Sequence, residues 1–216
     1  MHLGKLYKNF CIRQKSYSER ANEIINNKNS LEEWRFNYKS EVLISDIWQN
    51  WCKFSRELYF SSCRGCTTKD NKKIHPISEN LSRMWLSYLA KQAAYNKNVS
   101  PNGQNSFAIR KEPTWGDLEI FIKIITTVRP ENHQTLSASY GCLSKIKHLQ
   151  LVRNACAHKN IETLGEIREL TNHYDFERLK FASNLAWGIS AQDQCYAIDV
   201  WLHEMNTIAD LSTATI

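Results

Sequence analysis

The chain has 216 residues, of which 42% are hydrophobic and 23% charged, proportions typical of globular proteins. Its seven Gly and four Pro are about half the usual share, too few for the many tight turns of a β-sandwich or barrel. No stretch approaches the roughly 18 apolar residues of a membrane span, and the N-terminal segment lacks the apolar core of a secretory signal. Seven Cys without regular spacing argue against a disulfide framework. We therefore expect a soluble, cytoplasmic, all-α protein with one domain over residues 1–216.

Basic charge is concentrated in the middle of the chain. Residues 61–111 carry nine basic and two acidic groups, whereas residues 112–190 carry nine of each and residues 191–216 carry four acids and no Lys or Arg. A local surplus of this kind can attract a polyanion or an acidic partner, but on charge alone it is more typical of a solvated basic loop.

In chain order, the first predicted helix runs from Ser30 to about Ser61, because apolar residues recur there at steps of three and four. Ser30 and Glu33 have the spacing of a capping box at its start. The periodic apolar residues include Trp34, Trp48 and Trp51, which we assign to the core together with Trp85 of the next helix. A polar stretch follows over residues 63–75.

The next predicted helix spans about Pro76–Asn96, and residues 98–105 have the composition of a loop. The basic, loop-rich segment is thus expected over residues 61–115, inserted between helices. Further helices are predicted from Thr114–Asp117 to Arg129, from about Ser139 to Lys159, and from a capping box at Ser190–Asp193 to about Leu211. Residues 163–187 favour short helices or irregular structure.

The predicted helix over 139–159 carries the residues best suited to chemistry. Residues 132–161 contain no Asp or Glu. A helical wheel places one apolar face on the core side and a polar stripe opposite it. The apolar face comprises Cys142, Ile146, Leu149, Val152 and Cys156. The polar stripe comprises Lys147, Asn154 and His158. Such a stripe needs water, a ligand or a partner to contact.

Arg153, Asn154 and His158 suit the cleavage of an RNA phosphodiester. His changes protonation near neutral pH and can act as general acid or base, whereas Arg holds a fixed charge that stabilises a phosphate in the transition state. Asn can orient the imidazole or bind a phosphate oxygen. Since the substrate's 2′-hydroxyl is the nucleophile, the reaction needs no metal or other cofactor. Equally, Arg153 could pair with an acid of a neighbouring helix and His158 could be an ordinary surface histidine.

Arg153 and His158 are about 140° apart on an ideal helix. One straight helix does not aim both at a single point, but two copies of the chain could bring them together at an interface. The spacing therefore favours a composite site in a homodimer.

The run from Leu151 to His158, with Arg153, Asn154 and the Ala157–His158 pair, resembles the motif of the HEPN superfamily, an Arg followed after four to six residues by His. The resemblance implies an α-helical bundle, a dimer and a metal-independent endoribonuclease. It implies that Arg153 contacts the phosphate, that His158 is the general acid or base, and that Asn154 supports them. Members act as toxins of toxin–antitoxin pairs or as effectors of antiviral defence, and some are non-catalytic binding or dimerisation modules.

Other candidates are weaker. Cys63 and Cys66 have the spacing of half a zinc site, with His75, Cys142 or Cys156 as distant further ligands, but two ordinary loop cysteines explain them better. Cys156 itself is expected to be a small buried residue.

The acids Glu41, Asp46 and Glu57 of the long helix are each candidates to raise the pKa of the catalytic histidine. Trp115, beside Gly116, is the aromatic residue that we expect to stack on a base.

The sequence therefore predicts an all-α, HEPN-like bundle with two long basic loops that cleaves RNA, with Lys147 and Lys159 binding the RNA backbone. Expected partners are the RNA substrate, a second copy of the chain, and an antitoxin or defence protein that restrains the activity. A membrane partner is not expected. The main alternative is a non-catalytic dimerisation module that binds nucleic acid or a protein. A weaker one is a zinc-dependent nucleic-acid binder built on Cys63 and Cys66.

Overall fold

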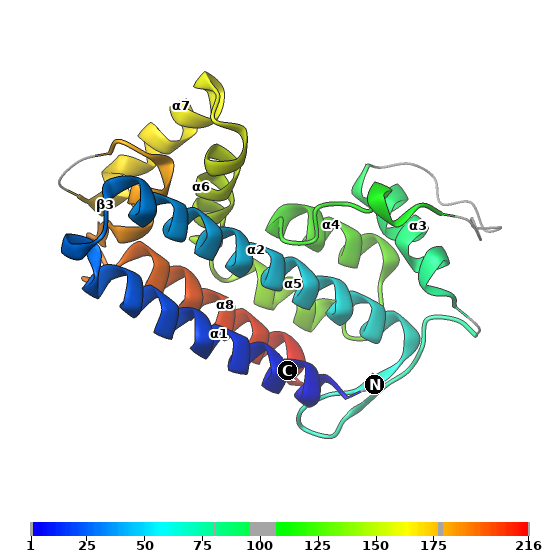
Figure 1. The fold of residues 1–216 in the computed structure, drawn as a ribbon. Helices are drawn as coiled ribbons and strands as arrows, with labels where there is room; N and C mark the ends of the chain where they lie inside the picture. The colour runs from blue at the N-terminus through cyan, green and yellow to red at the C-terminus, as the bar shows by residue number, and fades with distance from the viewer. Residues whose placement is uncertain (1, 80, 96–106, 177–178, 216) are drawn as a thin grey trace. The chain divides into compact units, whose positions relative to one another are not determined.

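The computed structural model describes residues 2–79, 81–95, 107–176 and 179–215, and these are mostly helical (Figure 1). The predicted all-α class is confirmed. Three long helices are α1 (Leu3–Asn26), α2 (Glu33–Arg64) and α8 (Ala197–Thr213). The shorter ones are α3 (Arg83–Ala94), α4 (Leu118–Val128), α5 (His133–Gly141), α6 (Ile146–His158) and α7 (Ile161–Leu170). No helix in these ranges is long and apolar enough to cross a membrane.

Short 3₁₀ turns and two-residue strands complete the described part of the chain. The 3₁₀ turns are η1 (Lys28–Ser30), η2 (Ile109–Lys111), η3 (Thr171–His173) and η4 (Ala182–Trp187). The strands form two antiparallel pairs, β1 (Cys66–Thr67) with β2 (Lys73–Ile74), and β3 (Tyr174–Asp175) with β4 (Ile189–Ser190).

The chain divides into two compact units. The first comprises Met1–Phe10, Trp51–Leu143 and Thr207–Ile216, and the second comprises Cys11–Asn50 and Ser144–Asn206. Helices α1, α2 and α8 each contribute residues to both units.

Aromatic packing holds the first unit together. Phe10 of α1 lies 4.5 Å from Phe54 of α2 between ring centroids, and Trp51 stacks on Tyr140 of α5 at 5.3 Å. Both polar tips are satisfied, because Trp51 Nε1 donates to the Gly116 carbonyl at 3.0 Å and the Tyr140 hydroxyl donates to Ser55 at 2.8 Å. Large aromatic rings with paired polar atoms give this small unit a well-determined core.

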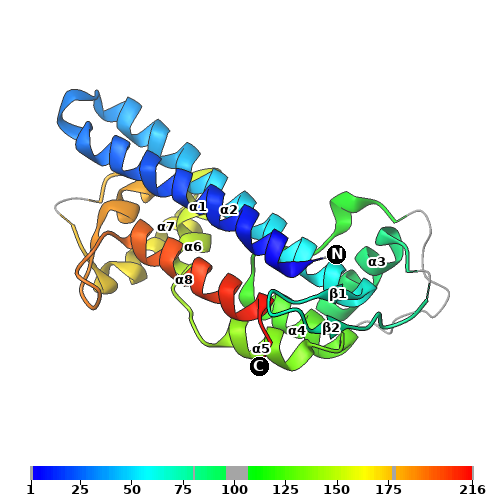
Figure 2. The ribbon, with the colours of Figure 1, turned by 90° about the horizontal axis from the view of Figure 1, so that it is seen from below.

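The hairpin of β1 and β2 lies beside the C-terminal end of α8, as Figure 2 shows. Lys69 in its turn forms an ion pair with Asp210 of α8. The Thr68 hydroxyl lies 3.2 Å from that of Thr215. The polar stretch expected over residues 63–75 is thus an ordered hairpin, not a long open loop, because its polar side chains find partners on α8.

In the second unit, α6 packs with its apolar side inward. Ile146, Leu149, Val152 and Ala155 are buried at steps of three residues, which is one face of a helix. The second unit also buries aromatic residues, which include Phe36 of α2, Trp187 of η4 and Trp201 of α8. These faces fix the rotation of α6, so its polar residues point away from the core.

Two expected capping boxes are wrong. The Ser30 hydroxyl donates to the Asn27 carbonyl at 2.9 Å within η1, and α2 begins at Glu33. Ser190 and Asp193 do bond each other, with the Asp193 amide donating to Ser190 Oγ at 3.2 Å, but this closes a turn and α8 begins at Ala197. A Ser/Asp pair at this spacing favours turns as well as helix starts.

Two helix predictions also need correction, and one helix was missed. The helix expected over 139–159 is two helices, α5 and α6, separated after Gly141. The helix expected from Pro76 begins only at Arg83, where the Ser82 hydroxyl accepts from the Trp85 amide. Helix α1 was not predicted. The loop expected over 98–105 lies outside the described residues.

Candidate functional site

Helix α6 is anchored at its start by a carboxylate from a distant part of the chain. Glu204 of α8, buried in the second unit, accepts a hydrogen bond from the Ile146 amide at 3.1 Å. Burial raises the pKa of Glu204, and bonds from the Ile146 and Lys145 amides oppose that shift. A carboxylate at a helix N-terminus satisfies otherwise unpaired amides, so Glu204 fixes where α6 begins.

A tight turn determines where α6 ends. Lys159 has a left-handed backbone with φ of 47°, and its amide donates to the Ala155 carbonyl at 3.0 Å. Asn160 then caps α7, its side chain accepting from the Thr163 amide at 2.9 Å. The link between α6 and α7 is therefore two residues long, and His158 is held at the exposed end of α6 immediately before it.

Arg153 and Asn154 lie together on the half-buried side of α6. Arg153 Nη1 donates to Asn154 Oδ1 at 3.2 Å. In the ranges that the structure describes, Arg153 forms no ion pair with a carboxylate. The alternative from the sequence, an ion pair between Arg153 and an acid of a neighbouring helix, is therefore not seen among the described residues. A half-buried guanidinium with only a neutral partner keeps its charge and most of its donors for another group.

His158 is exposed and does not contact Arg153 in one copy of the chain. No hydrogen bond or ion pair joins the two within the described residues, and five helical positions separate them by about 7.5 Å along the axis. Lys147 is 11 positions before His158, about 16 Å along the same axis. It is half-buried and already engaged in another interaction. One copy thus bonds Arg153 to Asn154, whereas His158, four positions after Asn154 on the same polar stripe, bonds neither of them within the described residues.

Lys159 connects the end of α6 to α2. Its ammonium group lies 3.2 Å from Glu41 Oε1, with the Lys side chain 63% exposed. Of the three acids considered from the sequence, Glu41 is the one whose carboxylate contacts a residue next to His158. Asp46 pairs with Arg20 at 2.8 Å, and Glu57 pairs with Arg83 and Arg56 in the first unit. A shallow hollow of about 520 Å³ adjoins Lys159.

The two cysteines assigned to the apolar face, Cys156 and Cys142, differ in burial. Cys156 is half-buried, not fully buried as expected, and burial, followed by the nearby Glu41 charge, raises its pKa to about 12. Cys142 is exposed because it follows the end of α5 and does not belong to α6. Its assignment to the apolar face is therefore wrong. A thiol that stays protonated is a poor nucleophile.

Cys63 and Cys66 are both buried in the first unit. Burial is the largest cause that raises the pKa of Cys63 to about 12 and that of Cys66 to about 11. His75, considered as a further zinc ligand, contacts a carboxylate: its Nδ1 lies 3.1 Å from Glu131 Oε2. Over the described ranges, no three His, Cys, Asp or Glu side chains are placed to hold a metal ion. The structure thus offers no third ligand to the cysteine pair among these residues.

Two aromatic predictions are reversed. Trp115 is only 5% exposed, and its Nε1 donates to Glu112 at 2.7 Å. It is therefore a core residue, not a platform for stacking. Trp34, expected in the core, is 61% exposed because it lies in the first turn of α2. Trp48 and Trp51 are buried as predicted, and Trp85 is half-buried.

Comparison with known proteins adds no relative to this picture: no protein-family model, curated protein or solved structure matches the chain.

Proposed function

We propose that this chain is a metal-independent endoribonuclease whose site is built from Arg153, Asn154 and His158. The observation that carries the proposal is the half-buried Arg153, bonded to Asn154 and without a carboxylate partner in the described residues, on the helix that ends at the exposed His158. The resemblance of this run to the HEPN motif supports the same assignment.

In the proposed reaction, a ribose 2′-hydroxyl attacks the adjacent phosphorus. Its proton passes to an imidazole acting as base, and the bond from phosphorus to the 5′-oxygen breaks. The leaving oxygen takes a proton from a second imidazole in its acid form. Arg153 stabilises the additional negative charge on the phosphate oxygens. The products are a 2′,3′-cyclic phosphate and a 5′-hydroxyl, which balances all atoms without a metal.

The reaction uses two acid–base groups, and the motif supplies one histidine per chain. A homodimer would supply both, His158 from each copy, and would bring Arg153 of one copy near His158 of the other. The separation of Arg153 from His158 within one copy favours this arrangement. Lys159, whose pair with Glu41 is exposed, would then bind the RNA backbone.

The basic residues of the first unit remain candidates for further RNA contacts. Two of them are already neutralised, Lys69 by Asp210 and Arg83 by Glu57. Because these two charges are already paired, we assign any RNA binding in this unit to other exposed basic side chains such as Lys72 and Lys73. The setting we propose is growth arrest or antiviral defence, with a partner protein restraining the nuclease.

The non-catalytic alternative also has an observation in its favour. Trp34, Tyr38 and Ile161 of the second unit are 61%, 62% and 88% exposed, and exposed apolar side chains are typical of contact surfaces. In that case Arg153 and His158 would only stabilise a complex.

The test is incubation of purified protein with mixed tRNA and mRNA in excess EDTA, with chemical mapping of the fragment ends. We expect cyclic-phosphate ends from wild type, and a loss of about 10²–10⁴-fold in rate for His158→Ala and for Arg153→Ala. His203→Ala, which removes another exposed histidine of the same unit, should cleave like wild type.

Light scattering on the double variant, Arg153→Ala with His158→Ala, separates the two functions. The nuclease proposal expects an unchanged oligomeric state with cleavage lost. A folded wild type that cleaves nothing, together with a double variant of altered oligomeric state, would favour the interaction module.

A further inference from the structure

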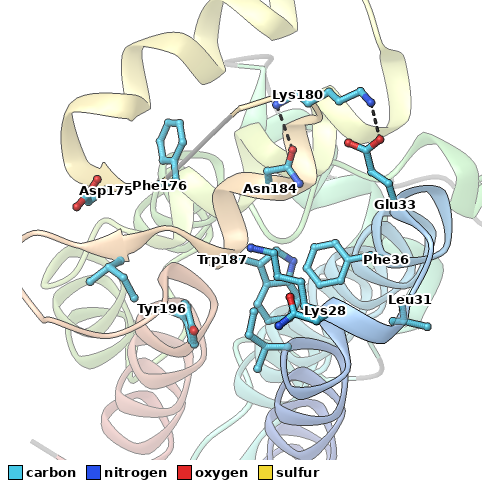
Figure 3. Close-up of a pocket in the computed structure, with 13 residues that line it drawn as sticks. Lys28, Leu31, Glu33, Phe36, Asp175, Phe176, Lys180, Asn184, Trp187 and Tyr196 are labelled. Carbon is cyan, nitrogen blue, oxygen red and sulfur yellow. Dashed lines mark hydrogen bonds and ion pairs between the residues drawn. The ribbon is translucent and has the colours of Figure 1, made fainter.

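A cavity of about 620 Å³ lies in the second unit, away from the end of α6. Figure 3 shows it between the turn that joins α1 to α2 and the segment from β3 to the residue before α8. Its volume falls in the range of about 300–1,000 Å³ that is typical of small-molecule sites. None of the residues lining it belongs to α6 or α7, so the cavity is separate from the proposed nuclease site.

One side of the cavity is aromatic and held in place by its neighbours. The rings of Phe36 and Trp187 lie 5.6 Å apart, and Tyr196 meets Trp187 edge-on at 6.2 Å. Trp187 Nε1 donates to Ser40 Oγ at 2.9 Å, which fixes the orientation of the indole. Leu31, between α1 and α2, adds aliphatic surface. This preformed, largely apolar side favours a ligand with a flat, apolar body.

The charged side chains around the cavity differ in their partners. Lys180 forms an ion pair with Glu33, as Figure 3 shows. Lys28 is also engaged in an interaction. Asp175 is exposed, and among the residues that the structure describes its side chain forms no ion pair or hydrogen bond. The charge that is left for a ligand is therefore a carboxylate, which attracts a cation and repels an anion.

The backbone pairing determines where this carboxylate lies. Asp175 of β3 is directly opposite Ile189 of β4, and Ile189 is in turn opposite Tyr196 through an antiparallel bridge. Directly opposite residues project their side chains from the same face of a sheet, and all three residues line the cavity. Since neighbouring strands are about 4.8 Å apart, the backbones of Asp175 and Tyr196 are about 10 Å apart, with the apolar Ile189 between them.

We propose that this cavity binds a free organic amine, a ligand with a flat apolar body and a protonated amino group. The apolar body packs against Tyr196, Trp187 and Phe36. The ammonium group reaches across Ile189 and donates hydrogen bonds to the Asp175 carboxylate. Such bonds are stronger than those between neutral groups because both partners are charged.

This ligand class accounts for both sides of the cavity. An anion would find Lys28 and Lys180 already engaged and would lie near the carboxylate of Asp175. A neutral apolar ligand would leave that carboxylate unused, and a small inorganic cation would leave the aromatic side unused. An arylalkylamine, in which a short chain joins an aromatic ring to an ammonium group, uses both.

The test is isothermal titration of tryptamine into the full-length wild-type protein without RNA, so that the result does not depend on the proposed cleavage. Tryptamine carries an indole ring and, at neutral pH, a charged amino group, because aliphatic amines lose their proton only at about pH 10. We expect saturable binding with a Kd below about 1 mM. Tryptophol, which has a hydroxyl in place of the ammonium group, should bind about five- to tenfold more weakly. The anion indole-3-acetate should bind more weakly than tryptophol.

Variants of the protein locate the site. Asp175→Asn should weaken tryptamine binding about five- to tenfold and leave tryptophol binding unchanged. Glu166→Gln removes an exposed carboxylate of α7 outside the cavity, so this matched control should bind tryptamine like wild type. Lys180→Gln should not weaken tryptamine binding, because a cation contributes nothing favourable to the binding of an amine.

The proposal is overturned if tryptamine shows no saturable binding below about 1 mM, if tryptophol binds as tightly as tryptamine, or if Asp175→Asn and Glu166→Gln have equal effects. Tyr196→Ala provides a second route, because it removes the half-buried edge of the aromatic side without removing a fully buried ring. This variant should weaken the binding of tryptamine and tryptophol alike. Unchanged affinity for both would show that they bind elsewhere and would also overturn the proposal.

Discussion

Two half-buried arginines, one in each unit, have very different partners. Arg56 forms a two-pronged ion pair with Glu112, with Nε to Oε2 at 2.7 Å and Nη2 to Oε1 at 2.8 Å. Glu112 also accepts from Trp115 Nε1 at 2.7 Å and from the Ser87 hydroxyl. Arg153 instead has the neutral Asn154 amide, 3.2 Å away. Both arginines are half-buried, but one guanidinium is neutralised by carboxylates inside the fold, and the other is not within the described residues.

The pKa of Glu112 reflects its role in the fold. Burial raises that pKa, but hydrogen bonds from Arg56, Ser87 and Trp115 outweigh burial and hold it below the usual range. A carboxylate with this many donors stabilises the folded chain. The contrast indicates that Arg56 serves folding, whereas Arg153 has no carboxylate partner among the described residues, as the proposed phosphate contact requires.

The largest expected effect tests the Arg56 side of the contrast. Glu112→Ala removes both short bonds to the half-buried guanidinium and leaves it only the longer contact with Glu57 at 3.3 Å. We expect a loss of about 3 kcal/mol in the free energy of unfolding. Urea denaturation followed by circular dichroism measures it. Arg153→Ala should change the same quantity by less than about 1 kcal/mol. Equal losses in the two variants would mean that Arg153 is also a structural residue, and the nuclease proposal would lose its main support.

A second prediction concerns His148, the half-buried histidine of α6. Burial, followed by the charges of His173 and Lys145, lowers the pKa of His148 to about 4. The unfolded chain has the ordinary histidine value of about 6.5. Between these two values the unfolded state binds a proton that the folded state does not. The free energy of unfolding should therefore fall as the pH drops through this window, by about 3 kcal/mol at most and by less because water screens the partly exposed ring.

The His148→Asn variant isolates that contribution. The difference in unfolding free energy between wild type and variant, measured by urea titration from about pH 7 to pH 4, should shrink as the pH falls. The Tyr174 hydroxyl, 2.7 Å from His148 Nδ1, accepts from Trp201 Nε1 at 3.1 Å and so has its own proton to donate to the neutral ring. A pH-independent difference would contradict the assignment of a neutral His148.

The sequence predicted the parts of the fold that depend on neighbours along one helix. Trp48, Trp51, Phe54 and Leu58 recur at three- and four-residue steps, and all are buried in α2. Helix α1 had a comparable signal that was missed. Its buried residues Leu3, Phe10, Tyr17 and Ile24 are each seven positions apart, which places them on one helix face.

Features set by distant contacts were beyond prediction. The start of α6 depends on Glu204, 58 positions after Ile146, and no local pattern marks that contact. The same holds for Trp115, whose neighbour Gly116 indicates a loop although the indole packs on Tyr59 and Phe60 of α2. At the candidate site, the sequence predicted that Arg153, Asn154 and His158 lie on a helix, but neither the break after Gly141 nor the bond between Arg153 and Asn154.

The smallest expected effect concerns the exposed pair of Lys159 and Glu41. Glu41→Gln should change the free energy of unfolding by less than about 1 kcal/mol, because exposed ion pairs contribute little. If Lys159 binds RNA, removing its partner charge should instead tighten RNA binding by about two- to threefold at low salt and not at high salt. Filter binding with the His158→Ala protein, so that RNA stays intact, measures this. Glu19→Gln, which frees Lys15 of α1 in the same way, is the matched control. Equal tightening in both variants would reflect net charge alone, whereas an effect confined to Glu41→Gln would locate the RNA at the end of α6.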